Sequence, residues 1–138
     1  MADMVLVRDV MTKEPRVVRR DTNVQEVVAT MNKFDISSVI VVEEKRPVGM
    51  VTHKDIISKI VQPRIPPDAV TALEIMSRPI ITIDENASVD EAARLMAKKH
   101  IKKLAVTRDN QLAGIITSSD LVREAPKLTQ LLQELLKK

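Results

Sequence analysis

The sequence predicts an α/β protein made of two copies of a β-α-β-β-α unit. The only two glycines, Gly49 and Gly114, lie 65 residues apart (114 − 49), and the residues around them match at that offset, as do Met31 and Met96. Within each copy, the apolar spacing changes between the alternation of a strand and the spacing of a helix. Two copies indicate a pseudo-symmetric pair rather than a solenoid, which needs at least three repeats.

A proline-rich stretch joins the two repeats, and a separate tail follows them. We place the first repeat at residues 5–62, the linker at 63–69 and the second repeat at 70–125, because the linker contains three prolines. Residues 126–138 begin with a proline and carry a leucine stripe, which predicts a C-terminal amphipathic helix. This helix could pack on its own module or pair with a second chain, and both alternatives stay open.

Each repeat opens with a short strand, expected at 16–19 and at 80–83, and a helix follows. Asn23 with Glu26, and Ser88 with Glu91, have the spacing of a capping box and mark the two helix starts. The buried face of each helix is predicted from residues spaced i, i+3, i+4 and i+7. These residues are Val24, Val27, Val28 and Met31 in the first repeat, and Val89, Ala92, Ala93 and Met96 in the second.

Two strands and a second helix complete each repeat. The strands are expected at 38–42 and 48–51, with a helix from Thr52. Their counterparts are strands at 104–107 and 112–116 and a helix from Thr117. The turns at 43–46 and 108–111 lack the Asn-Gly or Asp-Gly of a tight hairpin, so the turns alone do not indicate how the strands pair.

Composition argues against several classes of function. The absence of cysteine excludes disulfides, thiolate metal sites and a cysteine nucleophile. The only histidines, His53 and His100, have no partner at metal-ligand spacing, so we expect no metal and no cofactor. Phe34 is the only aromatic residue, which disfavours a platform for single-stranded nucleic acid. Without a glycine-rich phosphate loop or a Ser-His-Asp pattern, an enzyme is the least supported class.

Charge and hydropathy favour a cytoplasmic protein. The net charge of +3 and the sequence pI of about 9.3 permit partners that carry phosphate without requiring nucleic acid. No apolar run approaches the roughly 18 residues of a membrane span. The first residues lack the basic and apolar regions of a signal peptide. We therefore expect no association with a membrane.

The duplicated order, together with Gly-apolar-apolar-Thr-x-x-Asp at the last strand-to-helix junction, resembles the CBS domain family. The two copies of this motif are residues 49–55 and 114–120, and the openings around Met11-Thr12 and Met76-Ser77 are also typical of CBS repeats. The resemblance covers residues 5–124. The sequence departs from many members in having Ile40 and Ala105 where a proline is common, and in lacking an Asp-Gly turn.

The resemblance implies a tandem pair, or Bateman module, of the stand-alone regulatory type. In this family two repeats pack sheet to sheet about a pseudo-twofold axis and leave two symmetric clefts. The clefts commonly hold AMP, ADP, ATP or S-adenosylmethionine, and modules often form disc-like dimers. We expect an adenine nucleotide, with AMP as the leading candidate, a homodimer, and an unknown partner protein that receives the signal.

The chemistry of the two Thr-x-x-Asp motifs suits a nucleotide. An ionised carboxylate, Asp55 or Asp120, can accept hydrogen bonds from both hydroxyls of a ribose. The start of a helix offers free N–H groups to a phosphate, and Thr52 and Thr117 add a hydroxyl there. The glycine three residues before each threonine would let a ligand approach the strand. The alternative is that each motif is a capping box and nothing more.

Further candidates differ between the repeats. His53 and Lys54 could supply positive charge to a phosphate where the second repeat has Ser118 and Ser119, and we hypothesise that the two sites differ in affinity or in preferred phosphate number. The alternative is that His53 and Lys54 are solvated helix residues. The resemblance adds the segments that enter the middle strands and two aliphatic residues that could flank a base. These are Ile36, Ser37, Ser38, Ile101, Lys102, Lys103, Val17 and Ile81.

Two other functions compete with ligand sensing. The first is an interaction module with empty clefts that dimerises through its leucine tail. The second, which the sequence supports less, is nucleic-acid binding through the basic residues between 98 and 103; its affinity would collapse as salt rises.

Overall fold

The computed structural model describes residues 5–124 and confirms the β-α-β-β-α order in both repeats. The first repeat contains β2 (Val17–Arg19), α2 (Val24–Lys33), β3 (Ser38–Glu43), β4 (Arg46–Thr52) and α3 (His53–Ile56), which continues as the π-helical turn η1 (Ile57–Val61). The second contains β5 (Thr82–Asp84), α5 (Val89–Lys99), β6 (Lys103–Arg108), β7 (Gln111–Thr117) and α6 (Ser118–Glu124). The predicted C-terminal helix at 126–138 lies outside the described residues.

Each repeat also begins with an opening segment, ahead of the strand and helix described above, whose elements were not predicted from the sequence. The first opening contains α1 (Val7–Val10) and β1 (Thr12–Lys13). The second contains α4 (Ala72–Ile75) and is preceded by the 3-10 turn η2 (Pro67–Ala69) at the end of the linker. The helices α1 and α4 are equivalent, since their bounds also differ by 65 residues.

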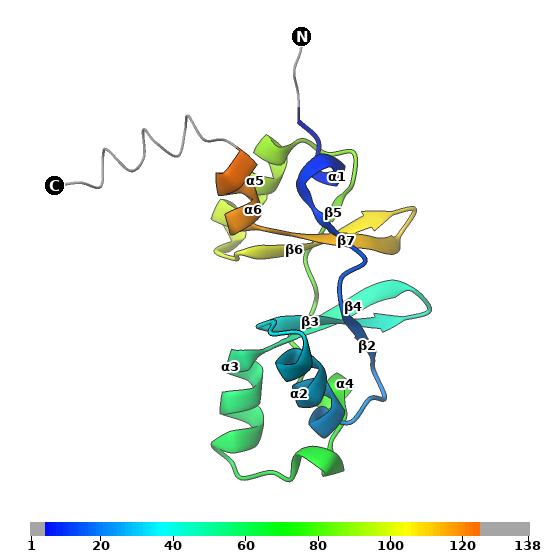
Figure 1. Cartoon of the computed structure of the whole chain (residues 1–138), viewed down its shortest axis with the longest axis vertical. Helices are drawn as coiled ribbons and strands as arrows, with labels where there is room; N and C mark the ends of the chain where they lie inside the picture. The colour runs from blue at the N-terminus through cyan, green and yellow to red at the C-terminus, as the bar shows by residue number, and fades with distance from the viewer. Residues whose placement is uncertain (1–4, 125–138) are drawn as a thin grey trace, which may run out of the picture. The chain divides into compact units, whose positions relative to one another are not determined.

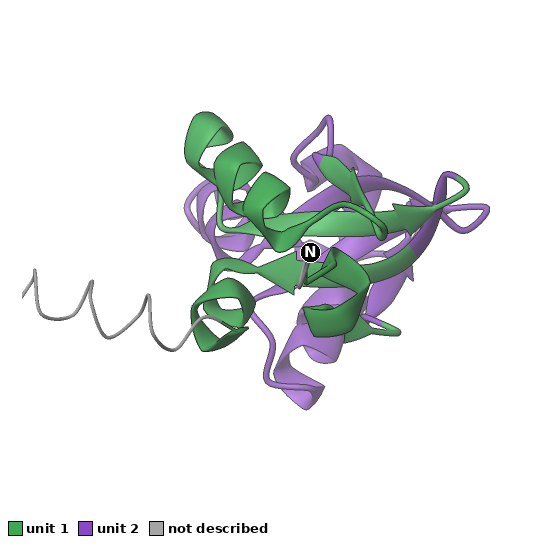
Figure 2. Ribbon diagram, turned by 90° about the horizontal axis from the view of Figure 1, so that it is seen from above, with its two compact units in different colours: residues 1–14, 82–109, 113–138 green, residues 15–81, 110–112 purple. Residues whose placement is uncertain are grey.

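The chain forms two compact units, and the openings are exchanged between the repeats (Figure 2). Unit 1 contains the first opening together with most of the second repeat, and unit 2 contains residues 15–81 and 110–112. In unit 1, β1 pairs antiparallel with β7, with Thr12 opposite Ile115. In unit 2, Ser77 of the second opening exchanges two backbone hydrogen bonds with Met50 of β4, at 2.8 and 3.2 Å. The units in three dimensions therefore cut across the sequence repeats 5–62 and 70–125.

Each unit is a small mixed sheet with helices on it. In unit 2, β3 pairs parallel with β2 and antiparallel with β4, and in unit 1 the strand order is β1-β7-β6-β5 with β5 parallel to β6. Helices α2, α3 and α4 lie on one side of the β2-β3-β4 sheet (Figure 1). They enclose a core that includes Val27, Met31, Val41, Ile60 and Ile75.

The hairpins are tight although they contain no glycine. The central residues Glu44 and Lys45 have φ of 50° and 68°, and Asp109 and Asn110 have φ of 53° and 65°. Two positive φ values in a two-residue loop are the mark of a type I′ turn, whose twist matches that of the flanking strands. The absence of Asn-Gly therefore did not prevent tight turns.

The buried face of the first helix in each repeat is narrower than its spacing predicts. In α2, Val24, Val27 and Met31 are buried and Val28 is half-buried. The prediction for Ala93 of α5 is wrong, because this residue is exposed. Val89 is half-buried, and Ala92 and Met96 are buried as predicted. Each helix packs against its sheet and a neighbouring helical segment, η2 for α2 and α6 for α5, and one edge of its apolar stripe stays at the surface.

The two glycines make room for the exchanged openings. A Cβ atom at Gly114 would lie 2.7 Å from both Met11 Sδ and the carbonyl oxygen of Thr12. A Cβ at Gly49 would collide with Met76 Sδ and lie 2.8 Å from Met76 Cγ. Protein atoms of the openings, instead of the ligand that the sequence analysis expects there, fill the space over each glycine.

Within residues 5–124, no helix is both long enough and apolar enough to cross a membrane.

Candidate functional site: two buried aspartates at strand-to-helix junctions

In unit 2, Asp55 closes a capping box at the start of α3. Its backbone N–H donates to Thr52 Oγ1 at 3.3 Å, and its carboxylate oxygen Oδ2 accepts from the Thr52 backbone N–H at 2.9 Å and from the Thr52 hydroxyl at 3.1 Å. The residue is only 5% exposed. The capping interpretation of this motif is therefore confirmed, although capping does not exclude a ligand.

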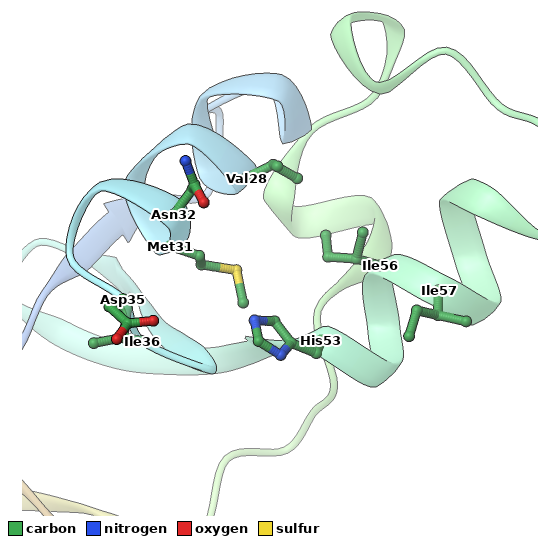
Figure 3. Close-up of a pocket in the computed structure, with 8 residues that line it drawn as sticks. All are labelled: Val28, Met31, Asn32, Asp35, Ile36, His53, Ile56 and Ile57. Atoms are coloured by element: carbon green, nitrogen blue, oxygen red, sulfur yellow. The ribbon is translucent and has the colours of Figure 1, made fainter.

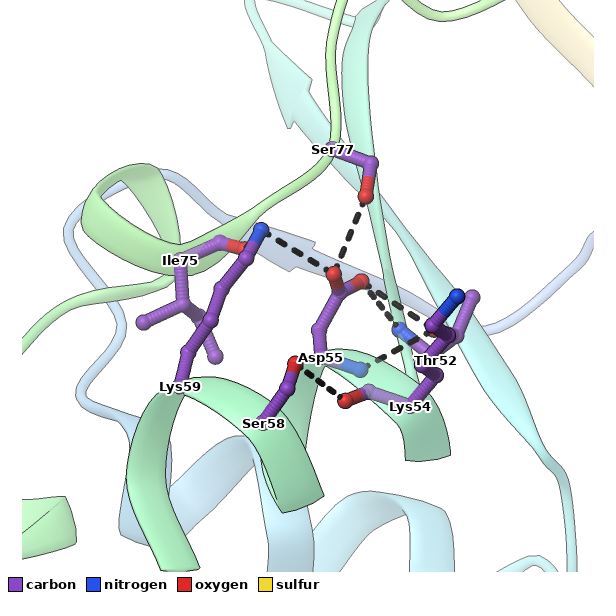
Figure 4. A network of polar contacts seen from close by, with 7 residues as sticks. All are labelled: Thr52, Lys54, Asp55, Ser58, Lys59, Ile75 and Ser77. Atoms are coloured by element: carbon purple, nitrogen blue, oxygen red, sulfur yellow. Dashed lines mark hydrogen bonds and ion pairs between the residues drawn. The ribbon is translucent and has the colours of Figure 1, made fainter. Parts of the chain in front are cut away.

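The second carboxylate oxygen of Asp55 also has two partners (Figure 4). Oδ1 accepts from the Ser77 hydroxyl at 3.0 Å and lies 3.1 Å from Lys59 Nζ. The Lys59 ammonium also donates to the carbonyl oxygen of Ile75 at 2.7 Å. Lys59 lies in η1 and Ser77 in the exchanged opening, so the carboxylate ties these two segments to the start of α3. All four acceptor positions of an ionised carboxylate are then in use.

In unit 1, Asp120 has the same backbone frame and fewer partners. Its N–H donates to Thr117 Oγ1 at 3.2 Å, and Oδ2 accepts from the Thr117 backbone N–H at 2.9 Å. Oδ1 is paired with the Arg123 guanidinium. Within residues 5–124 the carboxylate of Asp120 therefore has two donors, and two acceptor positions remain. The residue is 7% exposed.

A second segment adjoins the threonine in each unit. The N–H of His53 donates to the carbonyl oxygen of Ser37 at 3.1 Å, and the N–H of Ser118 donates to that of Lys102 at 2.8 Å. The residue pair that enters the middle strand is therefore Ser37-Ser38 in unit 2 and Lys102-Lys103 in unit 1. Lys103 is half-buried, and this burial lowers the pKa of its ammonium below the ordinary value.

Two of the predicted site residues lie in a different place, a groove between α2 and α3 (Figure 3). His53 and Ile36 line it, and the His53 ring points toward Met31. The groove has a volume of about 330 Å³. Its other lining residues are Val28, Asn32, Asp35, Ile56 and Ile57. His53 makes none of the polar contacts around Asp55, and its ring faces this groove instead.

The remaining predicted residues are at least partly accessible. Val17 is 42% exposed, whereas its neighbour Val18 is buried in the core. Three of them are half-buried, namely Ile81 just before β5, Ile101 just after α5, and Ser118. Exposed positions are those of Lys54 and Ser119 in the first turns of α3 and α6.

Sequence reasoning missed three partners of the aspartates, Ser77, Lys59 and Arg123. The spacing of Lys59 and Arg123, four and three residues after an aspartate, is a signal for an ion pair on a helix. Ser77 gave no such signal, because only the exchange of the openings brings it to Asp55. Within the described part of the chain, no three His, Cys, Asp or Glu side chains are grouped so as to hold a metal ion.

Comparison with known proteins identifies the family. The CBS domain family model matches residues 7–62 and again residues 72–127. The chain therefore belongs to the CBS domain family and carries two CBS domains in tandem. CBS domain pairs are regulatory modules.

The chain is 39% identical over 133 residues to the uncharacterized protein MK0525 of Methanopyrus kandleri, covering 95% of this chain and 65% of that protein. The chain thus spans a little under two thirds of this relative.

Two solved structures have the same fold. A conserved protein from Pyrococcus horikoshii matches with a TM-score of 0.77 and 32% identity, covering 91% of this chain and 95% of that one. The CBS domain pair of protein MJ0100 matches with a TM-score of 0.78 and 30% identity, covering 90% and 98%. That structure is a complex with 5′-methylthioadenosine and S-adenosyl-L-methionine.

Proposed function

We propose that this protein is a regulatory, non-catalytic module that binds an adenosine-containing ligand at one or both of the Thr-x-x-Asp junctions and passes the signal to a partner protein. The observation that carries the proposal is a buried, ionisable carboxylate at the same strand-to-helix junction in both units. A carboxylate held in place by its own cap is oriented in advance for the paired hydroxyls of a ribose.

Three further observations support an adenosine ligand. Lys102 and Lys103 adjoin Thr117 and supply positive charge for a phosphate. Val17 is an exposed aliphatic side chain of the kind that could flank a base. The related CBS domain pair of protein MJ0100 binds two adenosine compounds. Among the candidates, AMP remains our first choice.

Thermal unfolding of the full chain with AMP, ADP, ATP and S-adenosylmethionine tests this proposal. A ligand at about 100 times its dissociation constant stabilises the folded state by roughly 2.7 kcal/mol, which a melting curve resolves. We expect at least one of the four to raise the midpoint, and the Asp55→Ala/Asp120→Ala double variant to lose the shift. A folded natural chain that responds to none of them would refute the proposal.

A second function, self-association, is favoured by an exposed apolar surface. Ile57 and Val61 lie one turn apart on the helical run of α3 and η1 and are 61% and 62% exposed, beside the groove between α2 and α3. Apolar patches of this kind mark interaction surfaces. Light scattering of the natural chain and of Ile57→Glu/Val61→Glu tests it, since a dimer that uses this surface becomes monomeric in the variant. A variant dimer as stable as the natural one would exclude this surface.

A further inference from the structure

The two aspartates differ in their remaining capacity to bind a ligand. Asp55 is hydrogen-bonded or ion-paired at four positions, two on each oxygen. A ribose that approached it would have to displace Ser77 or Lys59, and both also hold the exchanged opening in place. Asp120 accepts from one N–H and pairs with one guanidinium. Among the contacts of residues 5–124 it therefore keeps two acceptor positions, one for each of the two adjacent hydroxyls of a ribose.

The residues that differ between the units also indicate that Asp55 is held more firmly than Asp120. The residue equivalent to Ser77 is Thr12, and the residue equivalent to Lys59 is Glu124, an acid that cannot pair with Asp120. The cation on Asp120 comes instead from Arg123, three residues on, whose side chain is 71% exposed. Among the described residues, the carboxylate is thus held by more partners in unit 2 than in unit 1.

The charge around the two junctions is also unequal. Lys102 and Lys103 in unit 1 occupy the positions of Ser37 and Ser38 in unit 2. The backbone bond from Ser118 to Lys102 holds this pair next to Thr117. In unit 2, His53 lines the groove between α2 and α3, so the histidine does not compensate for the missing lysines.

From these differences we infer that the chain holds one phosphorylated adenosine ligand, at the Thr117–Asp120 junction of unit 1, and that Asp55 is a structural cap. This inference rests on the proposed function. Asp120 accepts from the ribose hydroxyls, and Lys102 and Lys103 pair with the phosphate. Asp55 stays committed to Thr52, Ser77 and Lys59 and takes no ligand.

Calorimetric titration of the full chain with AMP and with adenosine tests the inference. We expect one AMP per chain. Because a charge-assisted hydrogen bond is among the stronger kinds, Asp120→Asn should weaken AMP binding about tenfold or more, whereas Asp55→Asn should change it less than about twofold. The ellipticity of each variant shows that it is folded, so a loss of binding is separated from a loss of structure.

A second pair of variants isolates the phosphate. Lys102→Ser/Lys103→Ser introduces the residues of unit 2 and should weaken AMP binding about tenfold while changing adenosine binding less than about twofold. The matched control is Lys98→Gln/Lys99→Gln, which removes two charges from the last turn of α5 and should leave both affinities within about twofold.

Several outcomes would overturn the inference and leave the proposed function intact. These are two AMP molecules per chain, a larger loss from Asp55→Asn than from Asp120→Asn, or unchanged AMP affinity in Lys102→Ser/Lys103→Ser. If neither AMP nor adenosine binds the natural chain, the proposed function fails and the inference fails with it.

Discussion

The two units share a backbone frame and use it differently. In both, a threonine caps a helix, and the aspartate three residues later returns the hydrogen bond. In unit 2 the same carboxylate also fixes the neighbouring opening through Ser77. In unit 1 the partner of the other oxygen, among the described residues, is Arg123, whose side chain is 71% exposed. Duplication thus preserves the local motif, and a few side chains outside the motif decide whether the carboxylate is structural or available.

The largest expected difference between the units concerns the glycines. Gly114→Ala should lower the free energy of unfolding by about 3 kcal/mol, because the new Cβ meets the rigid carbonyl oxygen of Thr12. Gly49→Ala should cost about 1 kcal/mol, since its closest neighbour is the Met76 side chain, which can rotate away. Urea unfolding measures both, and equal losses would show that the two openings are held alike.

The aspartates should differ next. Asp55→Ala leaves Ser77, Lys59 and the N-terminus of α3 without their acceptor and should cost about 2 kcal/mol. Asp120→Ala removes a cap and a partly exposed ion pair and should cost about 1 kcal/mol. The check is urea unfolding of both variants without ligand. An Asp120 variant less stable than the Asp55 variant would contradict the view that the Asp55 carboxylate contributes more to the free energy of unfolding.

A smaller effect is expected at two equivalent ion pairs, one in each unit, in which the acidic and the basic residue have exchanged positions. Arg20 pairs with Glu43 at 3.3 Å in unit 2, and at the equivalent positions Glu85 pairs with Arg108 at 3.9 Å in unit 1. Because the Arg20 and Glu43 side chains are 54% and 41% exposed, Arg20→Glu should cost about 0.5 kcal/mol, and adding Glu43→Arg should restore it. A double-mutant cycle by chemical denaturation measures the coupling, and a coupling above about 1 kcal/mol would contradict this view.

The smallest effect concerns pH and is expected in unit 1, because unit 2 has a serine in place of Lys103. The pKa of Lys103 is lowered in the folded chain, so between that pKa and its unfolded value near 10.5 the unfolded chain holds more protons. The free energy of unfolding should therefore rise with pH in this window, and Lys103→Ser should show less of this rise. Unfolding of both chains at about pH 8 and about pH 10 gives the comparison. Identical pH slopes would mean that burial of Lys103 has no thermodynamic consequence.

Much of the fold could be read from local sequence. The 65-residue repeat, the caps at Asn23 and Ser88 and the order of strands and helices all depend on neighbours within a few residues, and the structure confirms them. The errors are local as well. Ala93 has helical spacing but lies at the edge of the apolar face and is exposed.

The candidate site was predicted in part: the two motifs formed as expected, whereas the direction of one side chain did not follow from the sequence. The Thr-x-x-Asp motifs form the expected junctions because their hydrogen bonds join residues three apart. His53 was predicted to face a phosphate, yet its place in the helix directs the ring to the groove between α2 and α3. The direction of a side chain from a helix depends on the register of the helix against its neighbours, which spacing alone does not give.

The sequence by itself determined the repeats, the type and order of the main elements and the two capping boxes, because short-range hydrogen bonds and apolar periodicity specify them. Only the tertiary structure decided that the openings are exchanged, that Gly49 and Gly114 accommodate methionine side chains, and that Ser77 reaches Asp55. These features join residues 22 to more than 100 positions apart. Such contacts form only when the sheets assemble, so no local pattern encodes them.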